Sequence, residues 1–232
     1  MHSNICKNRI STHNYSVFRV IIRIFARYRT MKRLLHIAIW LLATTLLASC
    51  EEEGDVFTTQ QNNIEKYLTS TRRMVAEEQI GDVIEDNPPF YSTFGRYAYR
   101  HIVNYYEAGR DEWSVIEPGD RVEIEFNAYL FSGSEPSISN VYWSNIPATI
   151  SRIEASNNNP YADLDWSEEP LSFVIGNGEV VKGVDEALIG CHDQDSVQVY
   201  MTYTMAYDKR LVGTVPKRSS IAWYMKIVNV IK

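Results

Sequence analysis

The sequence predicts an α+β domain that follows a long basic leader. Apolar and polar residues alternate over several short stretches, as they do in strands buried on one face only. The alternation of residues 171–175 gives way at once to apolar residues at helical spacing in 180–188. Residues 1–49 hold eight basic residues and no acid, and they include an apolar run. We therefore expect a leader, a short N-terminal helical segment and a strand-rich domain.

The leader has the three parts of a secretory signal. From Met31 it contains two cations, an apolar run over 34–47 and small residues that end at Cys50. The run is shorter than the roughly 20 residues that a membrane-spanning helix needs. The ending Leu-Ala-Ser-Cys resembles a bacterial lipobox, which implies that Cys50 is lipidated and becomes the first residue of the mature protein. The alternative is a plain thiol near an ordinary cleavage site.

Because a complete signal starts at Met31, we expect translation to start there and residues 1–30 to be an upstream extension. The alternative for 17–28 is an amphipathic basic helix that touches a membrane. The leader should therefore occupy residues 1–49, and the protein should be anchored in the cell envelope of a bacterium, in the outer membrane facing the periplasm or the surface.

Beyond the leader the chain is strongly acidic. It keeps 15 of the 23 basic residues against all 29 acidic ones, a net charge of −14. Nucleic-acid binding needs clustered Lys and Arg, so this balance argues against a nucleic-acid partner. The acids at 51–55 form a short solvated tether, either a sorting signal toward the cell surface or a plain spacer.

Residues 50–90 are expected to hold this tether and two helices. Ile64, Tyr67 and Leu68 fall at helical spacing, so a helix should start near Thr58 or Thr59 and end near Ser70. A second short helix is expected from Met74 to Asp86, before Asn87-Pro88-Pro89. These helices should pack against the main domain or space it from the membrane.

Residues 91–232 are expected to form the main domain. Dense aromatic and β-branched residues in 90–106 predict one or two strands. Strict alternation predicts a long strand over 121–131, and further strands over 197–203 and 221–227. Gly176 and Gly178 should turn the strand at 171–175 sharply into the helix that Gly190 ends.

Four segments, at 174–188, 119–133, 205–207 and 215–216, together resemble the FKBP-type peptidyl-prolyl isomerases. The corner VIGNGEVVKGVDEAL at 174–188 resembles that family's strand-to-helix fingerprint, and GDRVEIEFNAYLFSG at 119–133 resembles its first long strand and hairpin. Met205-Ala206-Tyr207 looks like its loop tyrosine motif, and Val215-Pro216 like its apolar-proline tip. The resemblance covers residues 97–232 with one gap, and it implies an antiparallel twisted sheet wrapped around a short α-helix.

The sequence departs from the family pattern at three points. No Asp occurs from Arg121 to Ala162, where the family has a pocket aspartate, and Val184 stands where the family has a tryptophan. Residues 134–168 are longer than a compact member requires, so we expect an inserted flap there. Tyr142 and Trp143 in this flap either line the pocket or pack on the sheet edge, and we favour packing.

The resemblance implies a site for a prolyl peptide bond. The hydroxyl of Tyr207 and the backbone N–H of Val181 would hold substrate carbonyls. The apolar cup would consist of Phe126, Leu171, Val180, Val181, Val184, Val215 and Trp223. Each apolar residue could instead be plain core.

Other constellations are weaker. Cys191-His192-Asp193 lacks a second Cys-His pair at metal-ligand spacing, so we expect no metal, and we expect no other cofactor. With Cys50 lipidated and Cys6 removed with the signal, Cys191 should form no disulfide. Glu168 and Glu169 should belong to a solvated face.

The resulting expectation is a monomeric, lipid-anchored isomerase that acts on proline-containing segments of exported proteins. The competing hypothesis is a binding or assembly module of the cell envelope on the same fold, with weak or no catalysis.

Overall fold

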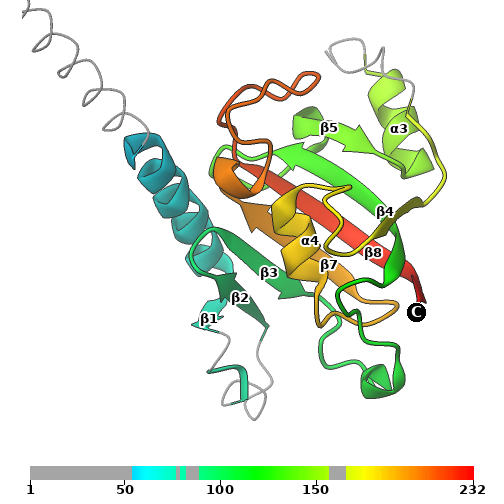
Figure 1. The fold of residues 1–232 in the computed structure, drawn as a ribbon. Coiled ribbons are helices and arrows are strands. Elements are labelled where there is room, and N and C mark those ends of the chain that lie inside the picture. Colours follow the sequence, from blue (N-terminus) through cyan, green and yellow to red (C-terminus); the bar gives the residue numbers. More distant parts are fainter. Residues whose placement is uncertain (1–53, 77–78, 82–88, 157–165) are drawn as a thin grey trace, which may run out of the picture. The chain divides into compact units, whose positions relative to one another are not determined.

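The computed structural model describes residues 54–76, 79–81, 89–156 and 166–232, and all of these except Gly54 belong to one compact unit, Asp55–Lys232. The centre of this unit is an antiparallel pair formed by the two longest strands, β4 (Arg121–Leu130) and β8 (Ile221–Ile231) (Figure 1). These strands are long because both alternate strictly between buried and more exposed residues over most of their length. The long strands predicted over 121–131 and 221–227 are therefore found.

The described residues build an eight-stranded sheet in the order β1-β2-β3-β7-β8-β4-β5, with β6 also paired to β4. Its only parallel pair among the described strands is β1 with β2. The remaining strands are β1 (Arg73–Ala76), β2 (Phe90–Phe94), β3 (Ala98–Ile102), β5 (Val141–Ser144), β6 (Leu171–Val174) and β7 (Ser196–Met201). The helices are residues 54–71, α3 (Pro147–Glu154), α4 (Lys182–Leu188) and the 3-10 turns η2 (Arg110–Glu112), η3 (Ile138–Asn140) and η4 (Tyr203–Met205).

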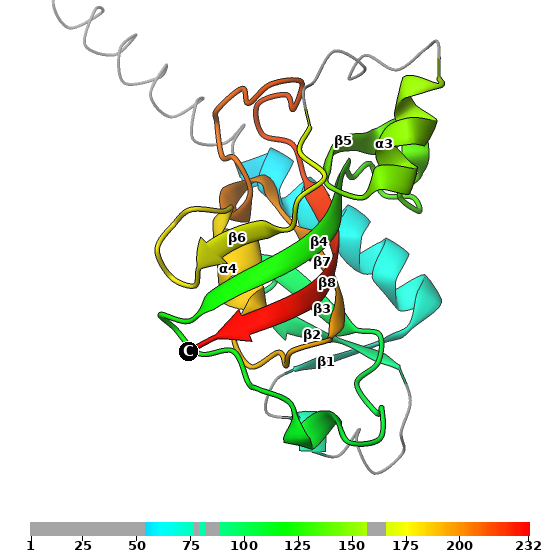
Figure 2. The same ribbon diagram turned by 90° about the vertical axis from the view of Figure 1, so that its right-hand side faces the viewer.

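Helices cover both faces of the sheet. On β8, Trp223 and Met225 belong to the core beneath α4, whereas Ala222, which directly precedes Trp223, packs with Ile64 and Leu68 of the N-terminal helix. Figure 2 shows α4 and the N-terminal helix on opposite sides of the strands. Successive side chains of a strand point to opposite faces, so the same strands supply two separate cores.

The outer edge of β4 changes partner along its length. Its first half pairs with β6 and its second half with β5. The buried side chain of Asn145 bridges the junction: its Oδ1 accepts the Phe126 N–H at 2.7 Å, and its Nδ2 donates to the Ile124 carbonyl at 2.9 Å. The amide replaces ladder hydrogen bonds that neither short strand supplies, because buried backbone groups need partners. Nothing in the sequence pattern had pointed to Asn145.

Of the two helices expected in the N-terminal segment, one needs correction and one is found. The second helix, expected from Met74 to Asp86, does not start there, because Arg73–Ala76 forms the strand β1. Val75 is buried against Phe90 at the sheet edge, and the backbone pairs with β2. The rest of that predicted helix lies largely outside the described residues. The helix expected from Thr58 or Thr59 to Ser70 is present. It packs against the sheet, which is one of the two roles expected for it.

The described part of the expected flap is ordered structure. Residues 134–156 contain η3, β5 and α3, and β5 extends the sheet. Residues 157–165 lie outside the described residues. The insertion thus continues the edge of the sheet next to the corner between β6 and α4.

Candidate functional site

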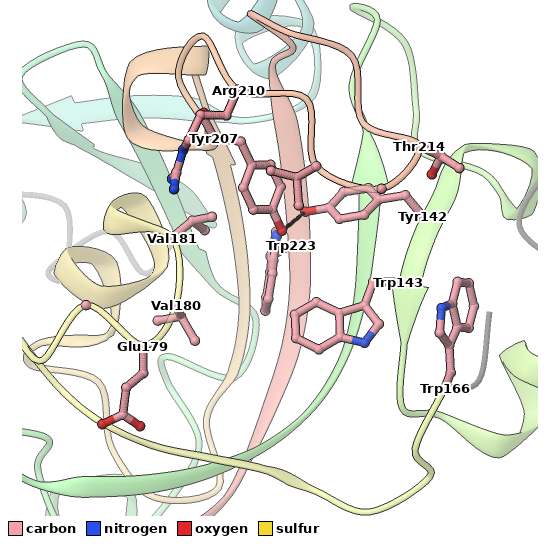
Figure 3. A pocket seen from close by; sticks show the side chains of 13 residues that line it. Tyr142, Trp143, Trp166, Glu179, Val180, Val181, Tyr207, Arg210, Thr214 and Trp223 are labelled. Carbon is pink, nitrogen blue, oxygen red and sulfur yellow. Dashed lines mark hydrogen bonds between the residues drawn. The ribbon is translucent and has the colours of Figure 1, made fainter.

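A cavity of about 540 Å³ opens beside the corner between β6 and α4. Five parts of the chain surround it: that corner, β5, the segment at Trp166, the loop that follows η4, and β8 (Figure 3). Its lining residues are Tyr142, Trp143, Trp166, Gly178, Glu179, Val180, Val181, Tyr207, Arg210, Val212, Gly213, Thr214 and Trp223. Cavities of this size lined mainly by apolar and aromatic side chains are typical small-ligand or peptide sites.

The corner is held by a buried carboxylate. Gly176 and Gly178 adopt left-handed backbone angles, φ 84° and 72°, which glycine reaches without steric cost. Asp185 of α4 accepts the Gly176 N–H at 2.8 Å, so helix and turn are tied together. Val180 and Val181 are thereby presented to the cavity, and Val181 forms the N-cap of α4.

The backbone N–H of Val181 is available to a ligand. Its carbonyl accepts the N–H groups of Val184 and Asp185, as an N-cap carbonyl does. The described residues offer the Val181 N–H itself no acceptor. A donor with no partner at the wall of an apolar cavity is a ready contact for a carbonyl oxygen.

Stacked aromatic rings form the floor. Trp223 stacks on Phe126 with ring centroids 4.6 Å apart and an interplanar angle of 9°. Trp143 meets both rings edge-on, at 4.7 Å from Phe126 and 5.6 Å from Trp223. Such pairs stabilise beyond their buried area. The floor is therefore a rigid apolar surface.

Two tyrosine hydroxyls meet above this floor. The Trp223 Nε1–H donates to the Tyr142 hydroxyl at 2.8 Å, and the hydroxyls of Tyr142 and Tyr207 lie 3.4 Å apart. Burial raises the pKa of Tyr142 well above its ordinary value and also raises the pKa of Tyr207. Both phenols are therefore protonated at neutral pH and can act as hydrogen-bond donors.

Charged groups stay at the rim. Glu179 and Arg210 are exposed, and each has a local partner: Glu179 accepts from Asn177 at 2.9 Å, and the Arg210 Nε donates to the Tyr207 carbonyl at 3.3 Å. Glu179 is the one acid among the described lining residues. The interior offers hydroxyl and amide donors in place of a carboxylate.

Four of the residues named from the sequence line the cavity, namely Val180, Val181, Tyr207 and Trp223. The other four do not line it and belong to the surrounding apolar core: Phe126, Leu171, Val184 and Val215. Phe126 lies beneath Trp223, and Val184 is fully buried within α4. These four side chains thus form a second apolar layer that supports the lining.

The prediction from the sequence missed most of the cavity wall that faces the corner between β6 and α4. Tyr142 and Trp143 both line the cavity, contrary to the favoured interpretation that they only pack on the sheet edge. Trp166 joins them from the far end of the insertion (Figure 3). The available signal was the clustering of aromatic residues in a segment longer than the resemblance required.

The remaining cysteine site is structural. Cys191 is fully buried, burial raises the pKa of its thiol to about 11, and Arg100 donates to its sulfur at 3.7 Å. Within the described residues no cluster of three or more His, Cys, Asp or Glu side chains could hold a metal ion. Cys6 and Cys50 lie outside the described residues. No helix in the described ranges has the length and apolar character to cross a membrane.

The fold and the site thus define an α+β domain with an aromatic pocket between a sheet and a short helix. Residues 152–228 match the family of FKBP-type peptidyl-prolyl cis-trans isomerases. The resemblance inferred from the sequence is therefore confirmed for this part of the chain. The match includes Val180, Val181, Tyr207 and Trp223, whereas Tyr142 and Trp143 lie before it.

Two relatives with names from the same family are similar to the chain. The chain is 27% identical over 107 residues to a short-type peptidyl-prolyl cis-trans isomerase of Methanocaldococcus jannaschii, covering 45% of this chain and 60% of that one. It is 33% identical over 63 residues to FK506-binding protein 1A of Neurospora crassa, covering 27% and 52%. The chain thus spans little more than half the length of these relatives. A crystal structure of the three FKBP domains of wheat FKBP73 aligns with a TM-score of 0.43 and 13% identity over 62% of this chain and 51% of that one.

Proposed function

We propose that the protein is a peptidyl-prolyl cis-trans isomerase that acts on exposed proline-containing segments. The observation that carries the proposal is the pair of donors, the Tyr207 hydroxyl and the Val181 N–H, at the wall of a cavity floored by Trp223. The family match over 152–228 supports it.

The reaction needs no nucleophile. Resonance holds the amide planar with a barrier of about 18–20 kcal/mol, and only before proline are the two isomers close in energy. A catalyst must favour the twisted, less polar amide over the planar one. An apolar enclosure does this, because it withholds the water that solvates the planar amide, and fixed donors hold the neighbouring carbonyls.

Each part of the site has a role in this mechanism. The indole of Trp223 and the side chains of Val180 and Val181 receive the prolyl ring. The Val181 N–H binds one substrate carbonyl, and the Tyr207 hydroxyl donates to another. Trp223 donates to Tyr142 and Tyr142 can donate to Tyr207, which leaves the Tyr207 proton for substrate.

A protease-coupled assay on a proline tetrapeptide tests this function. The purified protein at micromolar concentration should accelerate cis-trans interconversion above the uncatalysed rate. Absence of acceleration, with an intact fold by circular dichroism, would reject catalysis. Peptide binding seen as a change in tryptophan fluorescence without acceleration would instead support the binding module.

The cellular setting is part of the same proposal. We infer that Cys50 is lipidated and anchors the monomeric protein in a bacterial envelope membrane, where it assists the folding of exported proteins. The support is the signal-like segment from Met31 and the lipobox-like ending at Cys50. Cys50→Ser should move the protein from the membrane to the soluble fraction, whereas Cys6→Ser should leave it on the membrane. An unchanged membrane fraction for Cys50→Ser would contradict the anchor.

A further inference from the structure

One side chain of the N-terminal helix, that of Gln60, contacts both ends of the loop that places Tyr207 in the cavity lining. The Gln60 Oε1 accepts the Tyr203 N–H at 2.9 Å, and its Nε2 donates to the Arg218 carbonyl at 2.7 Å. Tyr203 opens the segment that leads to Tyr207, and Arg218 lies just before β8. A single amide therefore spans both ends of the loop 203–218.

This loop supplies much of the cavity lining, including Tyr207, Arg210 and Thr214. Inside the loop, the Arg218 N–H donates to the Asp208 carbonyl at 2.9 Å. Asp208 and Arg218 both have positive φ, 54° and 57°, which L residues adopt only when their surroundings enforce it. Loops of this length depend on a few tethering points for their position.

The helix that carries Gln60 has its own attachment to the sheet. Ile64 and Leu68 are fully buried in the core beneath it. Glu65 receives a forked ion pair from Arg96 at 2.6 and 2.8 Å. The adjacent Gln61 donates to the Arg96 carbonyl at 3.0 Å, away from the loop. Loss of the Gln60 amide would thus free the loop and leave the helix docked.

We propose that Gln60 is a positioning residue that fixes the loop 203–218, and with it the Tyr207 hydroxyl, over the cavity. This inference rests on the proposed isomerase function. A loosened loop reduces the fraction of molecules in which Tyr207 is placed to bind substrate. Apparent affinity falls in proportion to that fraction, whereas saturating substrate restores the ordered loop. The expected signature is a raised KM with a nearly unchanged kcat.

The test compares Gln60→Met with Gln61→Met. Both variants replace a glutamine of the same helix with methionine, which has nearly the same shape but no amide. Only the first variant loses contacts with the loop. Gln60→Met should raise KM for the proline peptide roughly three- to tenfold, as expected for weakened tethering hydrogen bonds. Gln61→Met should keep the KM of the unchanged protein.

Amide hydrogen exchange provides a readout that does not depend on activity. In Gln60→Met, exchange should accelerate at Arg210, Val215 and Arg218, whose N–H groups bond within the loop, and not in β4 or β8. Gln61→Met should leave the loop amides unchanged. Equal effects of both variants on KM and exchange, or unchanged loop exchange in Gln60→Met, would overturn the proposal.

A second variant covers the case in which Gln60→Met does not fold. Gln60→Glu keeps the acceptor for Tyr203 but sets a carboxylate oxygen against the Arg218 carbonyl, so loop exchange should still accelerate. Failure of the unchanged protein to accelerate isomerisation would refute the proposed function alone. The exchange comparison would then still decide the role of Gln60.

Discussion

The indole Nε1–H of Trp223 donates a hydrogen bond of 2.8 Å to the hydroxyl of Tyr142, and both side chains line the cavity of the candidate site. Trp223 comes from the last strand and Tyr142 from the inserted edge strand β5, so the bond joins the two sides of the pocket. The same hydroxyl lies 3.4 Å from that of Tyr207. The hydroxyl of Tyr142 therefore contacts both the pocket floor and the loop 203–218.

Tyr142→Phe should destabilise the fold by about 1–3 kcal/mol, because it leaves the buried Trp223 N–H without an acceptor. Urea unfolding measures this cost. Trp223→Phe removes the donor and provides the control. If the hydrogen bond stabilises the pocket, the double variant will lose less stability than the two single variants together, with a coupling of about 1 kcal/mol. Strictly additive losses would show that this hydrogen bond does not stabilise the pocket.

Tyr207→Phe should lower kcat/KM for a proline peptide by about twofold to tenfold, the effect of losing one neutral hydrogen bond in the transition state. The melting temperature should change little. Tyr203→Phe is a matched control, since Tyr203 is buried in the same segment but does not line the cavity. A drop in melting temperature without a change in kcat/KM would make Tyr207 a structural residue.

His101 should make the fold less stable in mild acid. Its ring is buried, its Nδ1–H donates to the Phe90 carbonyl at 2.8 Å, and burial lowers its pKa from 6.5 to about 4. The unfolded chain therefore binds a proton between these values that the folded chain excludes. The contribution of neutral His101 to the free energy of unfolding is fully present above pH 6.5. It is lost as the pH falls toward 4, and the loss reaches roughly 3 kcal/mol.

Urea midpoints at pH 7.5 and 4.5 measure this loss, and His101→Gln, which cannot titrate, should show a smaller decrease. An equal decrease in both proteins would assign the acid sensitivity to other groups.

Asp195→Ala should cost about 3–5 kcal/mol, because it leaves the Arg110 guanidinium as an unpaired buried charge. The pair is forked, with distances of 2.8 and 2.6 Å, and the Asp195 side chain is fully buried. Glu117→Ala removes an exposed ion pair, that with Lys232, and should cost far less because water screens exposed charges. Chemical denaturation of both variants distinguishes the two cases, and similar costs would contradict the argument.

Part of the site was predictable because it depends on local pattern. The glycines and valines of 174–188 specify a strand, a turn and a helix whose first residues face outward, so Val180 and Val181 were found in the lining. Alternation assigns a residue to a face but not to a depth. Phe126 and Trp223 share a face, and only their stacking decides that Trp223 lines the cavity and Phe126 lies beneath it.

The sequence by itself determined the alternating strands, the glycine corner and the N-terminal helix, because each follows from side-chain periodicity and backbone freedom within a few residues. The tertiary structure alone decided that Arg73–Ala76 is a strand, that Asn145 bridges β4 at its change of partner, and that Tyr142 and Trp143 face the pocket. These outcomes depend on contacts between segments far apart in the chain, and such contacts leave no period in the local sequence.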